Sequence, residues 1–383
     1  MKRRQTGRYE VSTTGGERVR AFVPAPLPPA PPLRLEGPLQ TMIADATLAL
    51  GRLDGVSALL PDKDLFLYSY VRKEAVLSSQ IEGTQSSLSD LLLFELNELP
   101  GVPLDDVTEV SNYVAALEYG LARMRAGFPI SNRLIREVHD VLLSRGRGAG
   151  KGPGQFRRSQ NWIGGTRPGN AAFVPPPHTA VPDAMAALER FVHAEDDGLP
   201  AVVRAALAHV QFETIHPFLD GNGRVGRLLV TLMLCDANVL REPLLYLSLY
   251  LKRHRTAYYE LLDRVRRDGD WEAWLAFFLE GVAVTAEGAV STARRLAALF
   301  DEDGARVRTL GRRAKSASRI HAALKARPII SIGEIAKRAG MTFPTASVAL
   351  EALAGLGIVR EMTGRRRSRV FAYERYLDIL NES

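Results

Sequence analysis

The sequence has 383 residues and a single cysteine, Cys235, so it cannot build a disulfide framework or a cysteine metal site. It contains no run approaching the roughly 18 consecutive apolar residues that a membrane-spanning helix needs. No apolar segment follows its basic N-terminus as one does in a signal peptide. These absences predict a cytoplasmic protein that makes no membrane contact. Cys235 is expected to be buried and unreactive, because a free cysteine behaves as a small hydrophobic residue.

Apolar residues make up 46% of the chain and charged residues 24%, which are ordinary values for a globular protein with a sizeable core. Apolar side chains recur at three- and four-residue spacing, which predicts a mainly α-helical fold. Residues 148–182 are rich in glycine and proline, which predicts a small β-hairpin or an extended flap. We expect an N-terminal proline-rich arm and helical region over 1–105, a helical central domain over 106–300, and a C-terminal domain over 311–383.

The last part of the chain carries the whole net charge of +7, because residues 301–383 hold 16 Lys and Arg against nine Asp and Glu. Its pattern of three helices followed by a basic strand, turn and strand predicts a winged helix-turn-helix domain. A localised basic patch favours DNA as the partner, with protein docking or dimerisation as the alternative. The expected DNA contacts are Thr342, Thr345 and Ser347 to bases, and Arg365, Arg366, Arg367 and Arg369 to phosphates or the minor groove.

A glycine-rich loop over residues 216–227 contains Gly221-x-Gly223-x-x-Gly226, the spacing of a dinucleotide-binding fingerprint. That fingerprint requires a strand before the loop, whereas residues 201–213 have helical periodicity. No Gly-Lys-Ser or Gly-Lys-Thr occurs, so a Walker phosphate loop is excluded as well. The loop is therefore expected to bind phosphate in another way.

The residue types in this loop suit phosphate chemistry. Glycines let backbone N–H groups turn inward as an anion nest, and the helix that follows adds free donors. His216 is a candidate base, and Asp220 is a hard oxygen ligand suited to Mg²⁺. The expected phosphate-binding residues are Gly221, Asn222, Gly223, Arg224, Gly226 and Arg227.

The segment His216-Pro-Phe-Leu-Asp-Gly-Asn-Gly-Arg-Val-Gly-Arg227 resembles the Fic-family motif His-x-Phe-x-Asp/Glu-Gly-Asn-Gly-Arg-x-x-Arg at every fixed position. Residues 153–157, 161–165 and 173–177 are also similar to parts of that family. The resemblance implies a helical Fic bundle that transfers AMP from ATP and Mg²⁺ to a Ser, Thr or Tyr hydroxyl of a protein, releasing pyrophosphate.

The resemblance also implies roles for individual residues. His216 would deprotonate the target hydroxyl, Asp220 would hold Mg²⁺, and Arg227 would grip the γ-phosphate. Phe218 would anchor the loop, and Arg224 would hold the β-phosphate region. Asn161, Trp162, Ile163 and Gly164 would form a flap that clamps the target backbone. Tyr258 and Tyr259 are assigned either to adenine contact or to the core.

Upstream of the loop, Ser78-x-x-x-Glu82-Gly83 resembles the family's inhibitory motif, Ser/Thr-x-x-x-Glu-Gly/Asn. The resemblance implies that Glu82 pairs with Arg227 and so inhibits the enzyme. Alternatively, Glu82 is a solvated residue at a helix end that Gly83 caps. The same carboxylate could also orient a water that removes AMP from the target.

Other functions stay open at this stage. The Fic part could be a nucleotide sensor for a DNA-binding regulator. A kinase-like reaction, as in Doc toxins, is less favoured because that branch has lysine at the position of Gly223. The expected ligands and partners are ATP, Mg²⁺, a protein target that could be the chain itself, and DNA. Homo-oligomerisation is left open.

Overall fold

The computed structural model describes residues 6–59, 63–96, 101–194, 198–365 and 368–382, and it is mainly helical, as the sequence predicts. The helices are α1 (Pro38–Leu59), α2 (Lys63–Ile81), α3 (Leu88–Glu95), α4 (Leu104–Arg125), α5 (Asn132–Leu142), α6 (Val181–Val192), α7 (Ala201–Ile215), α8 (Asn222–Asp236), α9 (Ser248–Arg253), α10 (Arg255–Asp268), α11 (Trp271–Arg308), α12 (Ala314–Ala326), α13 (Ile332–Arg338), α14 (Phe343–Gly355) and α15 (Glu374–Glu382). The strands are β1 (Gly7–Thr14), β2 (Glu17–Pro24), β3 (Ile329–Ser331), β4 (Arg360–Glu361) and β5 (Val370–Ala372).

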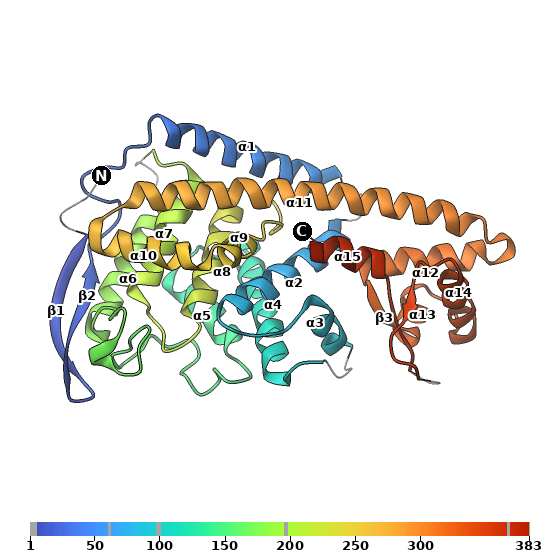
Figure 1. Ribbon diagram of the computed structural model, residues 1–383, viewed down its shortest axis with the longest axis horizontal. Coiled ribbons are helices and arrows are strands. Elements are labelled where there is room, and N and C mark those ends of the chain that lie inside the picture. Colours follow the sequence, from blue (N-terminus) through green and yellow to red (C-terminus); the bar gives the residue numbers. More distant parts are fainter. Residues whose placement is uncertain (1–5, 60–62, 97–100, 195–197, 366–367, 383) are drawn as a thin grey trace.

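The longest helix, α11, runs along most of the molecule and joins its two ends (Figure 1). It packs against α1 on one side and against α7, α12 and α15 on others. By length and composition α11 could also cross a membrane, but 61% of its most apolar window is buried inside the protein, as in a core helix. The helix continues to Arg308 because Phe300 and Val307 extend its buried face.

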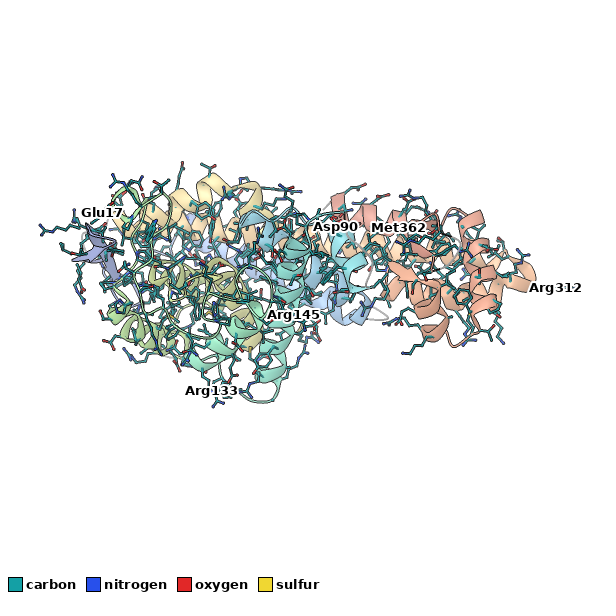
Figure 2. The ribbon with its side chains drawn as sticks, turned by 90° about the horizontal axis from the view of Figure 1, so that it is seen from below. Glu17, Asp90, Arg133, Arg145, Arg312 and Met362 are labelled. Atoms are coloured by element: carbon teal, nitrogen blue, oxygen red, sulfur yellow. The ribbon has the colours of Figure 1, made fainter. Side chains whose placement is uncertain are left out.

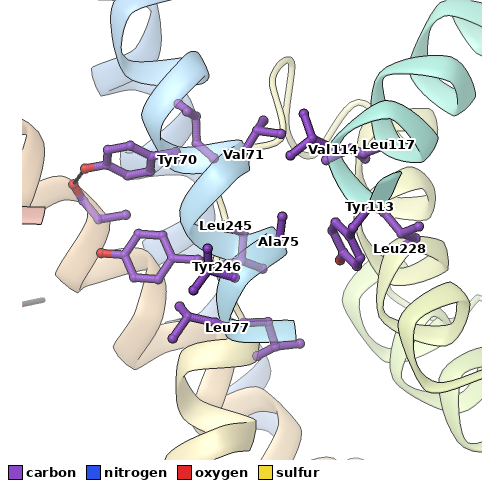
Figure 3. Packing of buried hydrophobic residues seen from close by; sticks show 14 of the residues in the cluster. Tyr70, Val71, Ala75, Leu77, Tyr113, Val114, Leu117, Leu228, Leu245 and Tyr246 are labelled. Atoms are coloured by element: carbon purple, nitrogen blue, oxygen red, sulfur yellow. Dashed lines mark hydrogen bonds between the residues drawn. The ribbon is translucent and has the colours of Figure 1, made fainter. Parts of the chain in front are cut away.

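The centre of the body is a helical bundle. α7 and α8 are buried along nearly their whole length and pack against each other, while α4 packs against α5, α8 and α2. Figure 3 shows Val71 and Ala75 of α2 facing Tyr113 and Val114 of α4. A helix that is apolar all round must lie inside the protein, so the loop between α7 and α8 is held by the most buried part of the fold.

The N-terminal arm contains a two-stranded hairpin that the sequence analysis did not predict. β1 pairs with β2 in antiparallel register from Gly7↔Pro24 to Thr14↔Glu17. Gly15 and Gly16 form the two-residue turn with φ of 58° and 82°, values that favour glycine in such hairpins. The Phe22 N–H donates to the Val174 carbonyl at 2.9 Å, which joins the hairpin to the predicted flap region.

The C-terminal part follows the predicted order of three helices, α12, α13 and α14, and then the strands β4 and β5. The structure adds the short strand β3, which pairs with β5 to give the sheet order β3-β5-β4. It also adds α15, a final helix that the sequence analysis did not predict. Because α15 packs on α11, the end of the chain returns to the body.

Helix α2 connects the C-terminal part with the interior of the bundle. The Lys73 ammonium donates to the Leu380 carbonyl of α15 at 2.7 Å, and the hydroxyls of Ser69 and Tyr376 lie 2.9 Å apart. All of these groups are buried. The C-terminal helix is therefore hydrogen-bonded to the helix that ends just before Glu82.

A cluster of charged and aromatic side chains strengthens the same junction. The Arg72 and Arg327 guanidinium groups lie 3.6 and 3.7 Å from the ring centroid of Tyr68. Glu95 accepts hydrogen bonds from Arg72 at 2.8 Å, from Arg327 at 3.2 Å and from the Tyr68 hydroxyl at 2.5 Å. Arg327 lies just beyond α12, so this contact also binds α2 to the C-terminal part.

Tyr376→Phe tests the buried bond between α15 and α2. Because the change leaves the Ser69 hydroxyl without its partner in a buried position, the free energy of unfolding is expected to fall by about 1–2 kcal/mol. Urea unfolding would measure the fall, with Tyr9→Phe as the control, since Tyr9 is 52% exposed. Equal stability of the two variants would contradict the assignment.

Candidate functional site

The glycine-rich loop lies between the end of α7 and the start of α8, and a few side chains fix its shape. Phe218 is fully buried, and its ring stacks on the His139 ring at 3.6 Å between centroids. The Asn222 amide closes the loop on itself, because Oδ1 accepts from the Phe218 N–H and Nδ2 donates to the Phe218 carbonyl, both at 2.9 Å. The Asn222 side chain therefore shapes the loop, which leaves its backbone N–H as the group that could meet a phosphate.

Two residues of the 148–182 segment brace the same loop from outside. The buried Arg157 guanidinium donates to the His216 carbonyl at 2.9 Å and to the Pro176 carbonyl at 2.5 Å. Asn161 Nδ2 donates to the Phe218 carbonyl at 3.1 Å. The predicted flap is therefore tied to the loop. The sequence analysis missed this role of Arg157.

His216 begins the loop in a left-handed conformation, with φ of 50° and ψ of 61°. Its side chain is 19% exposed, and Nδ1 lies 4.0 Å from Glu213 Oε2. Burial, together with the positive charges of Arg266 and Arg157, lowers the pKa of His216 to about 4. The imidazole is therefore neutral at pH 7 and has a free lone pair with which to take a proton.

The first turn of α8 presents backbone N–H groups without partners inside the helix, together with the positive end of the helix dipole. Asp220 lies beside this turn with its side chain 41% exposed. Its Oδ1 accepts from the Gly221 N–H at 2.6 Å. An anion seated on the turn would meet donors from the backbone and a carboxylate at the edge.

A carboxylate from another helix occupies this place. A Cβ added to Gly223 would lie 2.2 Å from Glu82 Oε1, so Glu82 rests directly on the glycine at the start of α8. Glu82 follows the end of α2, and Gly83 turns the chain away with φ of 103°. The Glu82 side chain stays 35% exposed, but it is paired with Arg227, so it is not a carboxylate that meets only water.

Arg227 donates hydrogen bonds to both Ser78 and Glu82. Its Nε donates to Ser78 Oγ at 2.7 Å, and its Nη2 donates to the Ser78 carbonyl at 3.1 Å and to Glu82 Oε1 at 2.6 Å. Burial alone raises the pKa of a carboxyl group, but the Arg227 guanidinium outweighs it and lowers the pKa of Glu82. Burial likewise disfavours the charge on Arg227, and Glu82 reverses this and raises its pKa. Both groups are ionised, which gives a charge-assisted pair.

Arg224 points toward a different carboxylate. Its Nη1 donates to Glu109 Oε2 of α4 at 3.2 Å, and its Nη2 donates to Asp220 Oδ1 at 3.3 Å. Glu109 also accepts from Arg147 at 2.7 Å. No local signal in the sequence marks Glu109, because it lies 115 positions before Arg224.

Gly226 does not face the phosphate position, which corrects its assignment as a phosphate-binding residue. It lies one turn inside α8, where an added Cβ would be 2.6 Å from Glu213 Oε1 and 3.3 Å from the Phe212 ring. His209 Nδ1 lies 3.0 Å from the Gly226 carbonyl. The missing side chain lets α7 and α8 approach closely.

Gly226→Ala is therefore expected to destabilise the protein rather than to change phosphate affinity directly. The new methyl group meets a carboxylate and an aromatic ring that are both buried, and such overpacking costs about 1–3 kcal/mol. Thermal unfolding would measure the loss. Gly288→Ala is the control, because its nearest neighbour, the Tyr246 hydroxyl, lies 3.7 Å from an added Cβ. Unchanged thermal stability of the Gly226 variant would contradict the packing argument.

The predicted flap has less strand structure than a full β-hairpin. Ile163 and Phe173 form a single antiparallel bridge, with N–H to carbonyl distances of 2.8 and 3.1 Å. The strand pairing does not continue beyond this bridge, because Gly164 and Gly165 follow it with φ of 68° and 74°. Trp162 is 39% exposed, so its side chain lies on the surface.

The two candidate adenine-binding tyrosines lie in different environments. Tyr258 is 1% exposed, and its hydroxyl lies 2.9 Å from His209 Nε2, so it belongs to the core. Tyr259 is 41% exposed and lies under Arg255, 5.1 Å from its guanidinium carbon. Only Tyr259 is placed where a ligand could reach it.

The candidate DNA-contacting residues lie at the start of α14 and on the turn before β5. Thr342 and Thr345 are exposed, with their hydroxyls 2.9 Å apart. Arg369 donates to Ser347 Oγ at 2.8 Å and pairs with Glu351 at 3.1 Å. Arg365 is exposed, and Arg366 and Arg367 lie outside the described residues.

Cys235, predicted to be buried, is half-buried, and burial raises the pKa of its thiol to about 12. A thiol with a raised pKa is a poor nucleophile at neutral pH. The prediction that it is unreactive therefore stands on its pKa more than on its exposure.

Comparisons with known proteins agree with this geometry. Residues 129–234 match the Fic/DOC family, and residues 40–122 match the N-terminal region of the same family. A protein named protein adenylyltransferase Fic from Culex quinquefasciatus is 31% identical over 205 residues, which are 52% of this chain and 38% of that protein. The protein of the same name from Drosophila melanogaster is 30% identical over 203 residues, with the same coverage. The chain therefore spans well under half the length of these relatives.

Solved structures support the fold. A Fic family protein from Desulfovibrio desulfuricans has a TM-score of 0.57 at 20% identity, covering 90% of this chain and 98% of that one. A Fic domain containing signalling protein from Bacteroides thetaiotaomicron has a TM-score of 0.53, also at 20% identity, covering 65% of this chain and 97% of the other.

Proposed function

From the Fic/DOC domain that residues 129–234 form, we propose that the chain is a protein adenylyltransferase, which transfers AMP from ATP to a Ser, Thr or Tyr hydroxyl of a protein. The observation that carries this proposal is the group of side chains gathered at the α7–α8 loop. There a neutral imidazole lies at one end of an anion-binding helix start and buried guanidinium groups lie at the other. The relatives named protein adenylyltransferase Fic support it.

In the proposed reaction, His216 takes the proton of the target hydroxyl as its oxygen attacks the α-phosphorus of ATP. The bond to the bridging oxygen breaks, and pyrophosphate leaves. The first N–H groups of α8 would hold the phosphates, and Arg224 and Arg227 would neutralise charge on the leaving group. Phosphoryl-type transfer depends on positioning and electrostatic stabilisation, which these groups supply without forming a covalent bond to the nucleotide.

The residues present fit a magnesium ion that would come with the nucleotide. Mg²⁺ is usually held by one or two carboxylates together with phosphate oxygens and waters, and Asp220 offers a partly exposed carboxylate beside the helix start. Among the described residues no group of three or more His, Cys, Asp or Glu side chains could hold a metal alone. When bound with ATP, the ion would neutralise phosphate charge during transfer.

In the proposed regulation, Glu82 inhibits the enzyme in the described state. Its carboxylate lies against Gly223 and pairs with Arg227, so it takes both the space and the cation that the terminal phosphate needs. ATP would bind productively only after Glu82 leaves. The same carboxylate near His216 keeps removal of AMP as an alternative activity of this site.

Labelled ATP tests the reaction class. The Glu82→Gly protein, incubated with cell extract, is expected to fix label from α-³²P ATP on protein and none from γ-³²P ATP. Transfer of the γ-label alone would instead indicate a kinase-like reaction. Gly223 favours AMP transfer, because the kinase-like branch that the motif resembles has lysine there.

For the C-terminal part, we propose a winged helix that binds DNA, so that enzyme and regulator functions coexist. Its excess of basic residues and the exposed start of α14, which includes Thr342, Phe343 and Thr345, support this proposal. Binding of duplex DNA by the His216→Ala protein should survive loss of transfer and weaken steeply with salt. Loss of binding on removal of 311–383 would agree, whereas binding of a protein partner without DNA would favour docking.

A further inference from the structure

A hollow of about 510 Å³ lies between the N-terminal hairpin, the flap and the end of α10. The hairpin contributes Tyr9, Arg18 and Arg20, and α10 contributes Arg266 and Arg267. Figure 2 shows Glu17, on the same hairpin, at the end of the molecule opposite Arg312. The hairpin side of the hollow therefore lies at the opposite end of the molecule from the proposed DNA-binding part.

Contacts within the protein already hold the walls of the hollow in place. The hairpin has eight paired positions, and a backbone hydrogen bond from Phe22 to Val174 fixes it to the flap. The rings of Tyr9, Phe22 and Phe173 follow one another at centroid distances of 5.2 and 6.3 Å. Arg167 of the flap region pairs with Glu17 at 2.8 Å. A partner would meet a formed surface rather than a loop that must first be ordered.

Arg266 connects the hollow to the catalytic base. Its guanidinium carbon lies 3.9 Å from the ring centroid of Phe173, and its Nε donates to Thr214 Oγ1 at 3.3 Å. Thr214 lies two residues before His216, and the charge of Arg266 helps to lower the pKa of His216. A chain that places a hydroxyl at His216 would therefore have neighbouring residues within reach of the hollow.

The charge of the lining is strongly positive. The lining holds four arginines, Arg18, Arg20, Arg266 and Arg267, and one carboxylate, Asp263. Arg267 already pairs with Asp263 and with the neighbouring Asp268, both at 3.2 Å, so the excess positive charge lies on the other three arginines. Neither Arg18 nor Arg20 forms a salt bridge with any residue that the structure describes. Arginine suits bidentate binding of carboxylates. The hollow therefore fits an anionic partner.

One face of the hairpin is mixed apolar and basic, which suits a polypeptide. The register pairs Val11 with Arg20 and Tyr9 with Phe22, so these side chains share a face. Tyr9 and Val11 are 52% and 56% exposed. Exposed aromatic and aliphatic groups beside arginines can bind the side chains of an acidic protein segment, and so the surface differs from a purely phosphate-binding one.

We propose that this hollow receives an acidic segment of the target protein and thereby selects substrates whose modified hydroxyl lies near glutamate or aspartate residues. That the bound segment belongs to a substrate rests on the proposed adenylyl transfer. The binding itself does not depend on that activity. It assigns the N-terminal hairpin to target selection, next to a loop that performs the chemistry.

Peptide binding tests the hollow directly. The probe is a fluorescein-labelled, glutamate-rich peptide with one serine, one threonine and one tyrosine, compared by anisotropy with a peptide that has glutamine in place of glutamate. The full chain should bind the acidic peptide more tightly, with an affinity that falls as salt rises. Arg20→Glu should weaken binding about tenfold, because it places a negative charge opposite the glutamates of the peptide.

Arg8→Glu is the matched control. Arg8 is an exposed arginine of the same hairpin, but it pairs with Val23 in the register and so lies on the opposite face from Arg20. It already has a partner in Glu10 at 2.8 Å. The expected change in affinity for the acidic peptide is less than about twofold.

A second measurement separates this proposal from the proposed function. With the Glu82→Gly protein and α-³²P ATP, the acidic peptide should be labelled faster than the glutamine peptide, and Arg20→Glu should remove that preference. Equal labelling together with equal binding would overturn the proposal and leave adenylyl transfer intact. Arg20-dependent binding without any labelling would support the hollow and contradict the transfer. Equal competition by a single-stranded oligonucleotide would overturn the choice of an acidic polypeptide.

Discussion

Glu82→Gly is expected to raise AMP transfer by about one to two orders of magnitude. The change removes the carboxylate that lies on Gly223 and pairs with Arg227 at 2.6 Å. It frees Arg227 for one charge-assisted contact with the nucleotide, which is worth about 1.5–3 kcal/mol. Each 1.4 kcal/mol corresponds to about a tenfold change in rate. Incorporation of label from α-³²P ATP into protein measures the effect.

Two further variants separate the charge of Glu82 from the flexibility that glycine introduces. Glu82→Gln removes the negative charge but keeps a side chain against Gly223, so it should release only part of the activity that Glu82→Gly releases. Ser78→Ala removes one of the bonds to Arg227 but keeps Glu82, so its increase should be smaller. If Glu82→Gly transferred AMP no faster than the unaltered protein, inhibition by this residue would be ruled out.

His216→Ala, made in the Glu82→Gly protein, is expected to reduce transfer by at least about 10²-fold and to undetectable levels if no other base substitutes. Nucleotide binding should persist, since the helix start, Arg224 and Arg227 are unchanged. Single-turnover labelling and the binding of a fluorescent ATP analogue would measure the two properties separately.

The control for this variant is His178→Ala, because His178 is exposed and lies in η2 (His178–Ala180), outside the loop. It should transfer AMP normally. The pKa of His216 is lowered to about 4, first by burial, and the neutral imidazole is the form that accepts a proton. Loss of base by protonation is therefore not expected on going from pH 8 to about pH 6. Transfer that survived the loss of His216 would exclude it as the base.

The glycine-rich loop between two buried helices could be predicted from sequence because its signal is local. Twelve consecutive positions contain His216, the start of α8 and the two arginines, Arg224 and Arg227. The order of three helices and then strands in the C-terminal part was also predicted, because each element has its own local pattern. Where a feature depends on neighbours in sequence, the pattern was sufficient.

Features that depend on distant contacts were less accessible. Glu109 and Arg157 shape the loop through contacts across 115 and 59 positions, and nothing near them in sequence indicates a partner. Gly226 matched a phosphate fingerprint, yet its neighbours are Glu213 and Phe212 of the preceding helix. A glycine in a motif indicates that a side chain would not fit at that position. Only the folded structure shows which neighbouring group occupies the space.

The hairpin at residues 7–24 was missed although a signal was present. Gly15-Gly16 lies between two eight-residue stretches, and a Gly-Gly pair is typical of a two-residue hairpin turn. The proline-rich segment that follows led to the prediction of a proline-rich arm in place of the hairpin. By contrast, β3 has only three residues and pairs with β5, so sequence alone gives little sign of it.

Helix α2 reaches from its contacts with Tyr376 and Leu380 at one end to Ser78 and Glu82 at the other. The same helix therefore contacts both the C-terminal part and, through Ser78, Arg227. If a ligand of the C-terminal part shifts this helix and so changes the affinity for ATP, thermodynamic reciprocity requires ATP to change the affinity for that ligand by the same factor.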